Sequence, residues 1–110
     1  MTSPFVADLG ALGAGVELLS RTAEATVSTI GGADVEVGLH RHDRHDEYGV
    51  LVAGRGVLTI GDVEHEIGPG SAWMIPRGVP HGGRYDGEFR VLVWFTPEED
   101  PAAPDRVELD

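Results

Sequence analysis

The chain has 110 residues, a formal net charge of −11 and no cysteine. This length fits one domain with one compact core. So negative a charge argues against nucleic acid or an anionic membrane as a partner, and the lack of cysteine excludes disulfides and thiolate metal ligands. All 8 basic residues are arginine, which excludes a mechanism that depends on a Schiff-base lysine.

No stretch has the pattern of a targeting or membrane segment. The first residues, MTSPFVADLG, show no positive charge followed by an apolar block. No apolar run approaches the roughly 18 residues that a membrane span needs. We therefore expect a cytoplasmic protein.

The first part of the chain predicts an irregular arm followed by strands. Glycines interrupt the apolar residues of 1–20 and argue against a stable helix, so we expect an arm with a short strand near 15–21. Residues 23–30 and 33–42 are strand-like and are separated by a turn at Gly31-Gly32. In the second of these strands the apolar side chains share one face and the histidines share the other.

The middle of the chain predicts short strands separated by glycine and proline turns. After a polar turn at 43–46, the expected strands are 48–53, 57–60, 63–67, 71–75, 82–85 and 89–95. A turn or bulge is expected at 54–56. Hairpin signals occur at Gly61-Asp62 and, more strongly, at Asp86-Gly87. Short strands without a helical period are typical of an all-β sandwich or barrel.

Composition divides the chain into an N-terminal arm at 1–22, a β-barrel domain at 23–96 and an acidic, proline-rich tail at 97–110. The tail has few apolar residues, which predicts a mobile, solvated segment. Val107 and Leu109 alternate with charged residues, and a strand that pairs with a neighbour is the alternative there.

A metal site is predicted by the stretch HRHDRHDEYG. His40 and His42 stand two residues apart, so in a strand both imidazoles point to one face. The polar turn lets Glu47 fold back beside them at the start of the next strand. His81, which follows a tight turn at 76–80, is the fourth ligand candidate. Imidazoles and a carboxylate on strands suit a divalent transition metal.

The two remaining histidines have other expected roles. His45 lies in the polar turn, where we expect it to be solvated or to line the mouth of the site. His65 shares a strand face with Val63 and Ile67, which predicts a structural or pocket-lining side chain. A single histidine on a strand is more often a surface or core residue than a ligand, so only the four-residue pattern favours a metal.

The first of these stretches resembles a motif of the cupin family. The spacing His40-x-His42-x4-Glu47-x6-Gly54 matches the first cupin motif without a gap. That motif usually begins with a glycine, and Asp34 stands at this position.

The second stretch resembles the second cupin motif. The spacing Gly70-x5-Pro76-x-Gly78-x2-His81 matches it up to the histidine, and Tyr85 stands where the family has asparagine. Together the two motifs make residues 25–96 similar to a cupin. The resemblance implies a double-stranded β-helix, or jelly roll, and often a homodimer, for which the apolar arm at 1–20 is suited.

The resemblance also implies a metal and an activity. Cupins use these four positions as metal ligands, which here are His40, His42, Glu47 and His81. We expect Fe(II) or Mn(II) first, with Ni(II), Co(II) or Zn(II) as alternatives. An octahedral ion with four protein ligands keeps two positions for water, substrate or dioxygen. The resemblance thus implies a metal-dependent enzyme that acts on a small organic molecule, with dioxygenase chemistry the most frequent in the family.

Other functions are compatible with the same scaffold, because fold does not select a reaction. The alternatives are an isomerase or cyclase, and a non-catalytic cupin that binds a small ligand or only a metal. An enzyme needs an acid or base near the metal, and Tyr85 and His45 are the expected catalytic residues. Arg77 and Arg84 flank His81 and offer a bidentate partner for a substrate carboxylate, although surface solvation is the more frequent role.

Overall fold

In the computed structural model, which describes residues 4–97 and 103–109, almost all regular structure is β-strand. A short 3-10 helix, η1, is followed by seven strands. The elements are η1 (Leu9–Ala11), β1 (Gly15–Arg21), β2 (Thr26–Arg41), β3 (Asp46–Ile60), β4 (Val63–Ile67), β5 (Ala72–Ile75), β6 (His81–Thr96) and β7 (Val107–Glu108). The prediction of an all-β fold is confirmed.

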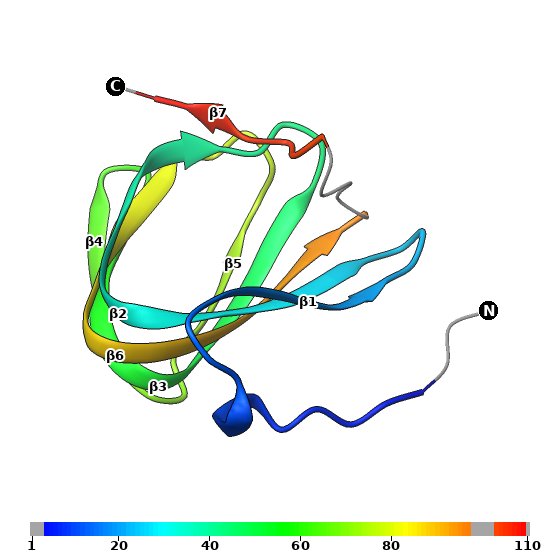
Figure 1. Ribbon diagram of the computed structural model, residues 1–110. Helices are drawn as coiled ribbons and strands as arrows, with labels where there is room; N and C mark the ends of the chain where they lie inside the picture. The colour runs from blue at the N-terminus through cyan, green and yellow to red at the C-terminus, as the bar shows by residue number, and fades with distance from the viewer. Residues whose placement is uncertain (1–3, 98–102, 110) are drawn as a thin grey trace.

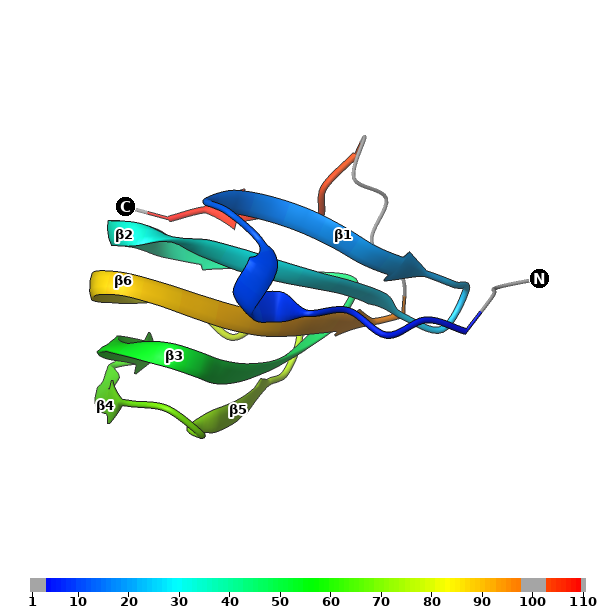
Figure 2. The same cartoon turned by 60° about the horizontal axis from the view of Figure 1, so that its bottom comes forward.

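The strands form one antiparallel sheet that curls into a barrel. Figure 1 shows β2, β6 and β3 curving around a common interior. The order across the sheet is β1-β2-β6-β3-β4, with β5 paired to β3 and β7 paired to β2. Figure 2, which views the barrel from another side, shows the strands stacked in this order. This is the jelly-roll barrel that the sequence predicts.

Each of the three long strands has a positive-φ residue where it bends. These residues are Asp34 in β2, Gly54 in β3 and Gly87 in β6, with φ of 52°, 97° and 70°. They lie near one another across the sheet, since Ala33 pairs with Glu88 and the register of both strand pairs shifts here. Because bulges bend a strand and increase its twist, this line of irregular residues lets the sheet fold over into a barrel.

The hairpin predicted at Asp86-Gly87 is wrong. β6 runs continuously from His81 to Thr96, with Gly87 inside it. The dipeptide signals a positive φ, and a bulge satisfies this requirement as well as a two-residue turn does. Gly31-Gly32 likewise lies within β2. The hairpin at Gly61-Asp62 is confirmed, because Ile60 pairs with Val63 across it.

Asp34 replaces the glycine of the first motif without loss of backbone geometry. Its φ of 52° lies in the left-handed region, which aspartate visits more readily than most residues. Its Oδ1 accepts a hydrogen bond of 2.8 Å from the backbone N–H of Gly87, on the neighbouring bulge. Asp34 therefore joins two of the three bends.

The core lies on the concave side of the sheet. The buried cluster consists of Leu51, Phe89, Val91 and Val93. Leu51, from the middle of β3, is 0% exposed. Because successive side chains of a strand point to opposite faces, β2, β3 and β6 each direct every second side chain into the barrel. Apolar side chains fill the middle of this inner face, and the metal-site residues lie on the same face toward one end of the barrel.

Arg90 holds the N-terminal arm on the outside of the barrel. Its side chain crosses Gly31, where an added Cβ would lie 2.4 Å from the guanidinium carbon. It donates hydrogen bonds of 2.6 and 2.7 Å to the carbonyls of Leu12 and Gly13. Part of the predicted arm is therefore fixed to its own barrel.

The described part of the C-terminal segment differs from the expected solvated tail. β7 pairs with the end of β2, and the Leu109 N–H donates to the carbonyl of Leu39 at 2.9 Å. Asp105 is buried, and its hydrogen bonds, described below, explain why residues 103–109 lie against the barrel. Residues 98–102 and 110 are outside the described part. The division at 1–22, 23–96 and 97–110 stays a prediction.

Among the described residues, no helix is both long and apolar enough to cross a membrane.

Candidate metal centre

Three different strands bring the four predicted ligands to one end of the barrel. His40 lies near the end of β2 and His42 directly after it, Glu47 lies at the start of β3, and His81 lies at the start of β6. One ligand atom from each residue lies within 4.8 Å of the other three, and all four residues are buried. The local spacing, together with the resemblance to the two cupin motifs, thus predicted the four residues that the fold brings together.

Backbone carbonyls fix the tautomer of all three imidazoles. Each Nδ1 lies within hydrogen-bond distance of a carbonyl oxygen, and these belong to Gly38 for His40 (2.7 Å), Asp105 for His42 (2.6 Å) and Val79 for His81 (3.0 Å). A carbonyl only accepts, so Nδ1 carries the hydrogen in each ring. In the neutral ring Nε2 is then a lone-pair donor, which is how outer hydrogen bonds orient metal-binding histidines.

The electrostatics of the cluster fit a cation. Nε2 of His42 and Nε2 of His81 each lie 3.3 Å from Oε1 of Glu47, so two neutral rings would direct lone pairs at a carboxylate. Burial opposes ionisation of Glu47; where the two rings carry a proton on Nε2, their hydrogen bonds to the carboxylate hold its pKa well below its usual range. Burial lowers the pKa of His40 to about 4, which keeps this ring in the neutral, metal-binding form. A divalent cation between these atoms would relieve the repulsion.

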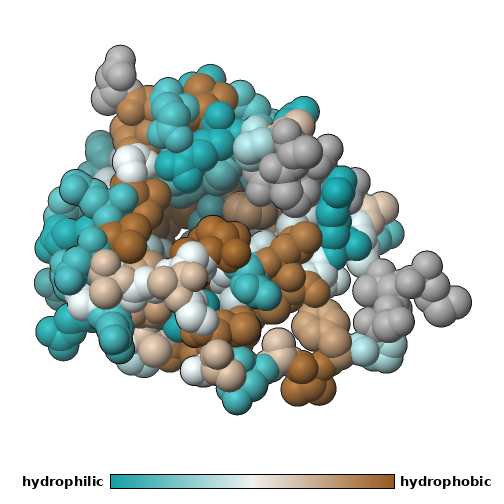
Figure 3. Space-filling model, viewed as in Figure 1, coloured by the Kyte–Doolittle hydropathy of each residue, from teal (hydrophilic) through white to brown (hydrophobic). Residues whose placement is uncertain are grey.

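A cavity of about 170 Å³ opens above the cluster, with His40, His42, Glu47 and His81 in its lining. Figure 3 shows apolar side chains around the hollow on this face of the molecule. The aromatic part of the lining is Trp73, Tyr85, Phe89 and Phe95. The cavity is therefore polar at the ligands and mainly apolar along its wall.

Tyr85 is the predicted catalytic residue that borders this cavity. Its ring stacks on Phe89, with centroids 4.1 Å apart. Burial and the charge of Glu47 raise its pKa to about 12, so its hydroxyl stays protonated at neutral pH. His65, for which a pocket-lining role was one expectation, is exposed on β4 and does not line the cavity.

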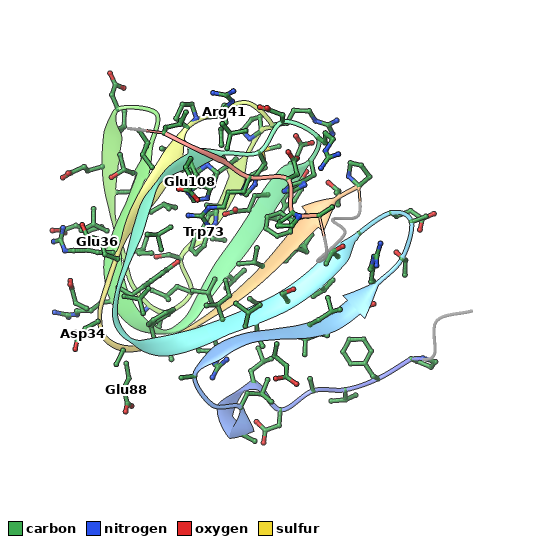
Figure 4. All side chains as sticks on the ribbon, turned by 45° about the horizontal axis from the view of Figure 1, so that its top comes forward. Asp34, Glu36, Arg41, Trp73, Glu88 and Glu108 are labelled. Atoms are coloured by element: carbon green, nitrogen blue, oxygen red, sulfur yellow. The ribbon has the colours of Figure 1, made fainter. Side chains whose placement is uncertain are left out.

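Trp73 orients the carboxylate ligand. Figure 4 shows it inside the curve of the barrel, and its indole Nε1 donates to Oε2 of Glu47 at 3.1 Å. Gly49 is its partner on β3, and a Cβ there would lie 2.2 Å from the indole ring. Gly49 thus lets the indole lie across β3. The sequence left the orientation of Trp73 open, because only the register of β5 on β3 reveals this contact.

His45 is buried, so the expectation that it is solvated is wrong. It is 1% exposed and packs against His42 and Phe95, with centroids 4.6 and 4.3 Å away. It lies behind His42 and is not among the residues that line the cavity. Its Nδ1 lies 3.3 Å from Oδ2 of Asp105. Burial lowers its pKa to about 4, so the ring is neutral at pH 7.

Asp105 joins the C-terminal segment to the metal site. Besides accepting from His42 through its carbonyl, its carboxylate accepts from the backbone N–H groups of Asp43 and Arg44, at 3.1 and 2.6 Å. It therefore fixes both a ligand ring and the turn between β2 and β3. The sequence gives no local signal for this role, because the contacts join residues 61 to 63 positions apart.

Comparison with protein families matches residues 26–95 to the family described as "Cupin domain". The chain belongs to the cupin family. This cupin is 38% identical over 55 residues to the uncharacterized protein SCO3923 of Streptomyces coelicolor, and the match covers 49% of this chain and 52% of that protein. The matched stretch thus spans about half the length of that relative.

Solved cupin structures have the same fold. KdgF from Halomonas sp. aligns with a TM-score of 0.75 and 21% identity, over 79% of this chain and 81% of that chain. The capsular polysaccharide assembling protein CapF from Staphylococcus aureus aligns with a TM-score of 0.77 and 21% identity, over 96% of this chain and 33% of that chain. At such identity these structures support the fold alone.

We expect Trp73→Phe to weaken metal binding by this cupin by about 10- to 100-fold, the usual effect of losing an outer hydrogen bond to a ligand. Phenylalanine keeps an aromatic ring in the cavity but cannot donate to Glu47. Competition against a fluorescent chelator measures the change. The matched control is Trp94→Phe, since Trp94 stacks on Tyr48 away from the cluster. Equal affinity in both variants would contradict this role for the indole.

Proposed function

We propose that this cupin is a metal-dependent enzyme that acts on a small organic molecule, with dioxygenase-type chemistry as the first candidate reaction. The observation that supports this is the convergence of three tautomer-fixed imidazoles and the Glu47 carboxylate beside an apolar cavity. A divalent ion held there, Fe(II) or Mn(II) before Ni(II), Co(II) or Zn(II), would supply Lewis acidity or redox capacity.

The protein's own groups would position the substrate and exclude water. The apolar wall suits the body of a small organic molecule. Tyr85 is the proposed proton or hydrogen-bond donor, because it borders the cavity and its hydroxyl, whose pKa burial raises still further above neutrality, is protonated at pH 7. His45, which contacts His42 and Asp105 behind the cavity, is proposed to hold the ligand ring in place rather than to touch substrate.

A non-catalytic cupin that binds a small ligand or only a metal is the second candidate. It is favoured by the scarcity of acid–base groups: besides the four ligands, the titratable residues of the described cavity lining are Tyr85, Arg84 and Arg106. An isomerase or cyclase would use the same site without dioxygen. Substrate turnover separates the enzymes from the non-catalytic binding protein, and dioxygen consumption separates a dioxygenase from an isomerase or cyclase.

A homodimer is also proposed. Val16 and Leu18 on the edge strand β1 are 72% and 49% exposed, and exposed apolar edges are frequently covered by a partner. Light scattering coupled to gel filtration would distinguish a dimer from a monomer.

Elemental analysis and oxygen uptake on the same preparation test the proposed enzyme. Near-stoichiometric iron or manganese, with oxygen consumed in the presence of a panel of small organic acids and phenols, would support a dioxygenase. Bound metal with substrate turnover but no oxygen uptake would support an isomerase or cyclase. If the protein holds no metal and takes none up, the enzyme proposal fails.

Chelation is expected to destabilise the protein. A ligand that binds only the native state stabilises it by about 4 kcal/mol at 1,000 times its Kd, which for a domain of this size is a Tm shift of more than about 10 °C. Differential scanning fluorimetry with EDTA, and then with metal added back, measures the shift. A Tm that changes neither with EDTA nor with added metal would contradict a filled metal site. His42→Ala provides the control, since its melt should not respond to EDTA.

A further inference from the structure

We propose that the residue before β7, Arg106, forms part of the substrate-site wall and binds the carboxylate of a small acid with an apolar body. This inference rests on the proposed function, because it places the ligand in the cavity above the metal cluster. It adds a substrate class and a residue from the C-terminal segment, which the sequence pattern assigned to a solvated tail.

Strand pairing directs Arg106 toward the cavity. Glu108 of β7 pairs with His40 of β2, and Val107 pairs with Arg41. Side chains of directly opposed residues project from the same face of a sheet, and residues two apart on one strand share that face. Glu108 therefore lies on the face of the ligand His40, and Arg106, which immediately precedes β7, is close enough for its charge to act on His40 and is part of the cavity lining. Figure 1 shows β7 running along β2 at this open end of the barrel.

Arg106 lies at the mouth of the cavity, where its guanidinium can contact both solvent and a bound anion. Its side chain is 40% exposed, so it stands between the cavity and solvent. Its Nε pairs with Oε1 of Glu108, which holds the guanidinium beside the open end of the barrel, where Figure 4 labels Glu108. A guanidinium carries five N–H donors in a planar fork, and the Nη groups can bind a second carboxylate bidentately.

The other arginine that borders the cavity is less suited to this role. Arg84 precedes Tyr85 on β6, and adjacent residues of a strand project to opposite faces. Since Tyr85 faces the cavity, the Arg84 side chain projects away from it, and there it pairs with Asp86 at 3.3 Å while 56% exposed. Arg106 is thus the basic side chain that the described fold presents to a ligand above the metal cluster.

The surroundings of Arg106 select an acid with an apolar body. The protein has a formal net charge of −11, so a small anion is repelled from most of its surface and gains from one local cation. The wall beyond Arg106 is mainly apolar, including Phe89 and Phe95. Glu108 competes with an incoming carboxylate for the same guanidinium, so its charge limits the affinity for anions.

Benzoate and benzamide test the proposal, because they share a shape and differ in charge. Each is titrated by calorimetry into the wild type, Arg106→Gln, Glu108→Gln and the control Arg55→Gln, whose parent residue is exposed on β3 outside the cavity. All proteins are measured both metal-free and after loading with Zn(II), and their zinc content is determined.

We expect Arg106→Gln to weaken benzoate binding by about tenfold, as for loss of a hydrogen bond to a charged group, and to change benzamide binding less than twofold. Glu108→Gln should strengthen benzoate binding severalfold, and Arg55→Gln should change neither. Unchanged benzoate affinity in Arg106→Gln, equal losses for both ligands, or no benzoate binding by the wild type would overturn the inference. Failure to take up Zn(II), and likewise Fe(II) and Mn(II) in the elemental analysis, would overturn the proposed function instead, while the metal-free titrations still decide the role of Arg106.

Discussion

Replacing His81 by alanine is expected to abolish stoichiometric metal binding while the β-barrel remains folded. The imidazole is 3% exposed and its Nε2 faces Glu47, so its loss removes one of four ligands. Since loss of a single outer hydrogen bond to a ligand costs about 10- to 100-fold in metal affinity, loss of the ligand itself should cost more than about 100-fold. Mass spectrometry of the purified protein measures metal content, and circular dichroism monitors the fold.

His65→Ala is the matched control for this experiment. His65 is exposed on β4 and lies outside the cavity lining, so its removal makes the same chemical change away from the cluster. The control should keep the metal content of the wild type. Full metal content in His81→Ala, or equal loss in both variants, would remove the assignment of the metal site to this cluster.

Leu51→Ala is expected to lower the free energy of unfolding by about 2–5 kcal/mol, the usual cost of truncating a fully buried leucine. Leu51 is 0% exposed and belongs to the cluster with Phe89, Val91 and Val93, so alanine leaves a cavity that the surrounding strands cannot close. Urea denaturation measures the change in the free energy of unfolding.

Val52→Ala, at the next position of β3, is the control for the core. Val52 is 43% exposed, and its truncation should change the free energy of unfolding by less than about 0.5 kcal/mol. If the two variants lost similar stability, the concave side of the sheet would not be the main core. Metal binding should persist in both folded variants, because neither side chain lines the metal cavity.

Three of the four candidate ligands could be found from local spacing in the sequence, and His81 was joined to them by its match to the second cupin motif. His40 and His42 share a strand face by spacing alone, and Glu47 follows one turn later. The groups that orient these ligands could not be found in this way. Trp73 reaches Glu47 across 26 positions and Asp105 reaches His42 across 63. Such contacts depend on strand register, which no short pattern specifies.

The difference between local signals and long-range strand pairing also explains which features of the fold the sequence did not predict. The sequence located the positive-φ positions at Gly54, Gly61 and Gly87, but it missed Asp34, which falls inside the predicted strand 33–42, and it could not tell a turn from a bulge. At Gly61-Asp62 the chain reverses, and at Asp86-Gly87 it continues in the same strand. Both dipeptides supply a glycine that accepts a positive φ. Around Asp86-Gly87 the chain continues as one strand because β2 pairs with it on both sides of Asp34 and Asp34 accepts a hydrogen bond from Gly87.

The three bent strands have a consequence for how the molecule opens. β2, β3 and β6 each run through the bend and contribute to the sheet on both sides of it. The part of the sheet before the bend and the part after it share the same three strands. Opening one part therefore also disturbs the hydrogen bonds of the other, so local opening of these strands costs much free energy. Their amide hydrogens should exchange with solvent only through cooperative global unfolding, whereas those of β1, β4 and β7 should exchange through smaller, more frequent openings at the sheet margins.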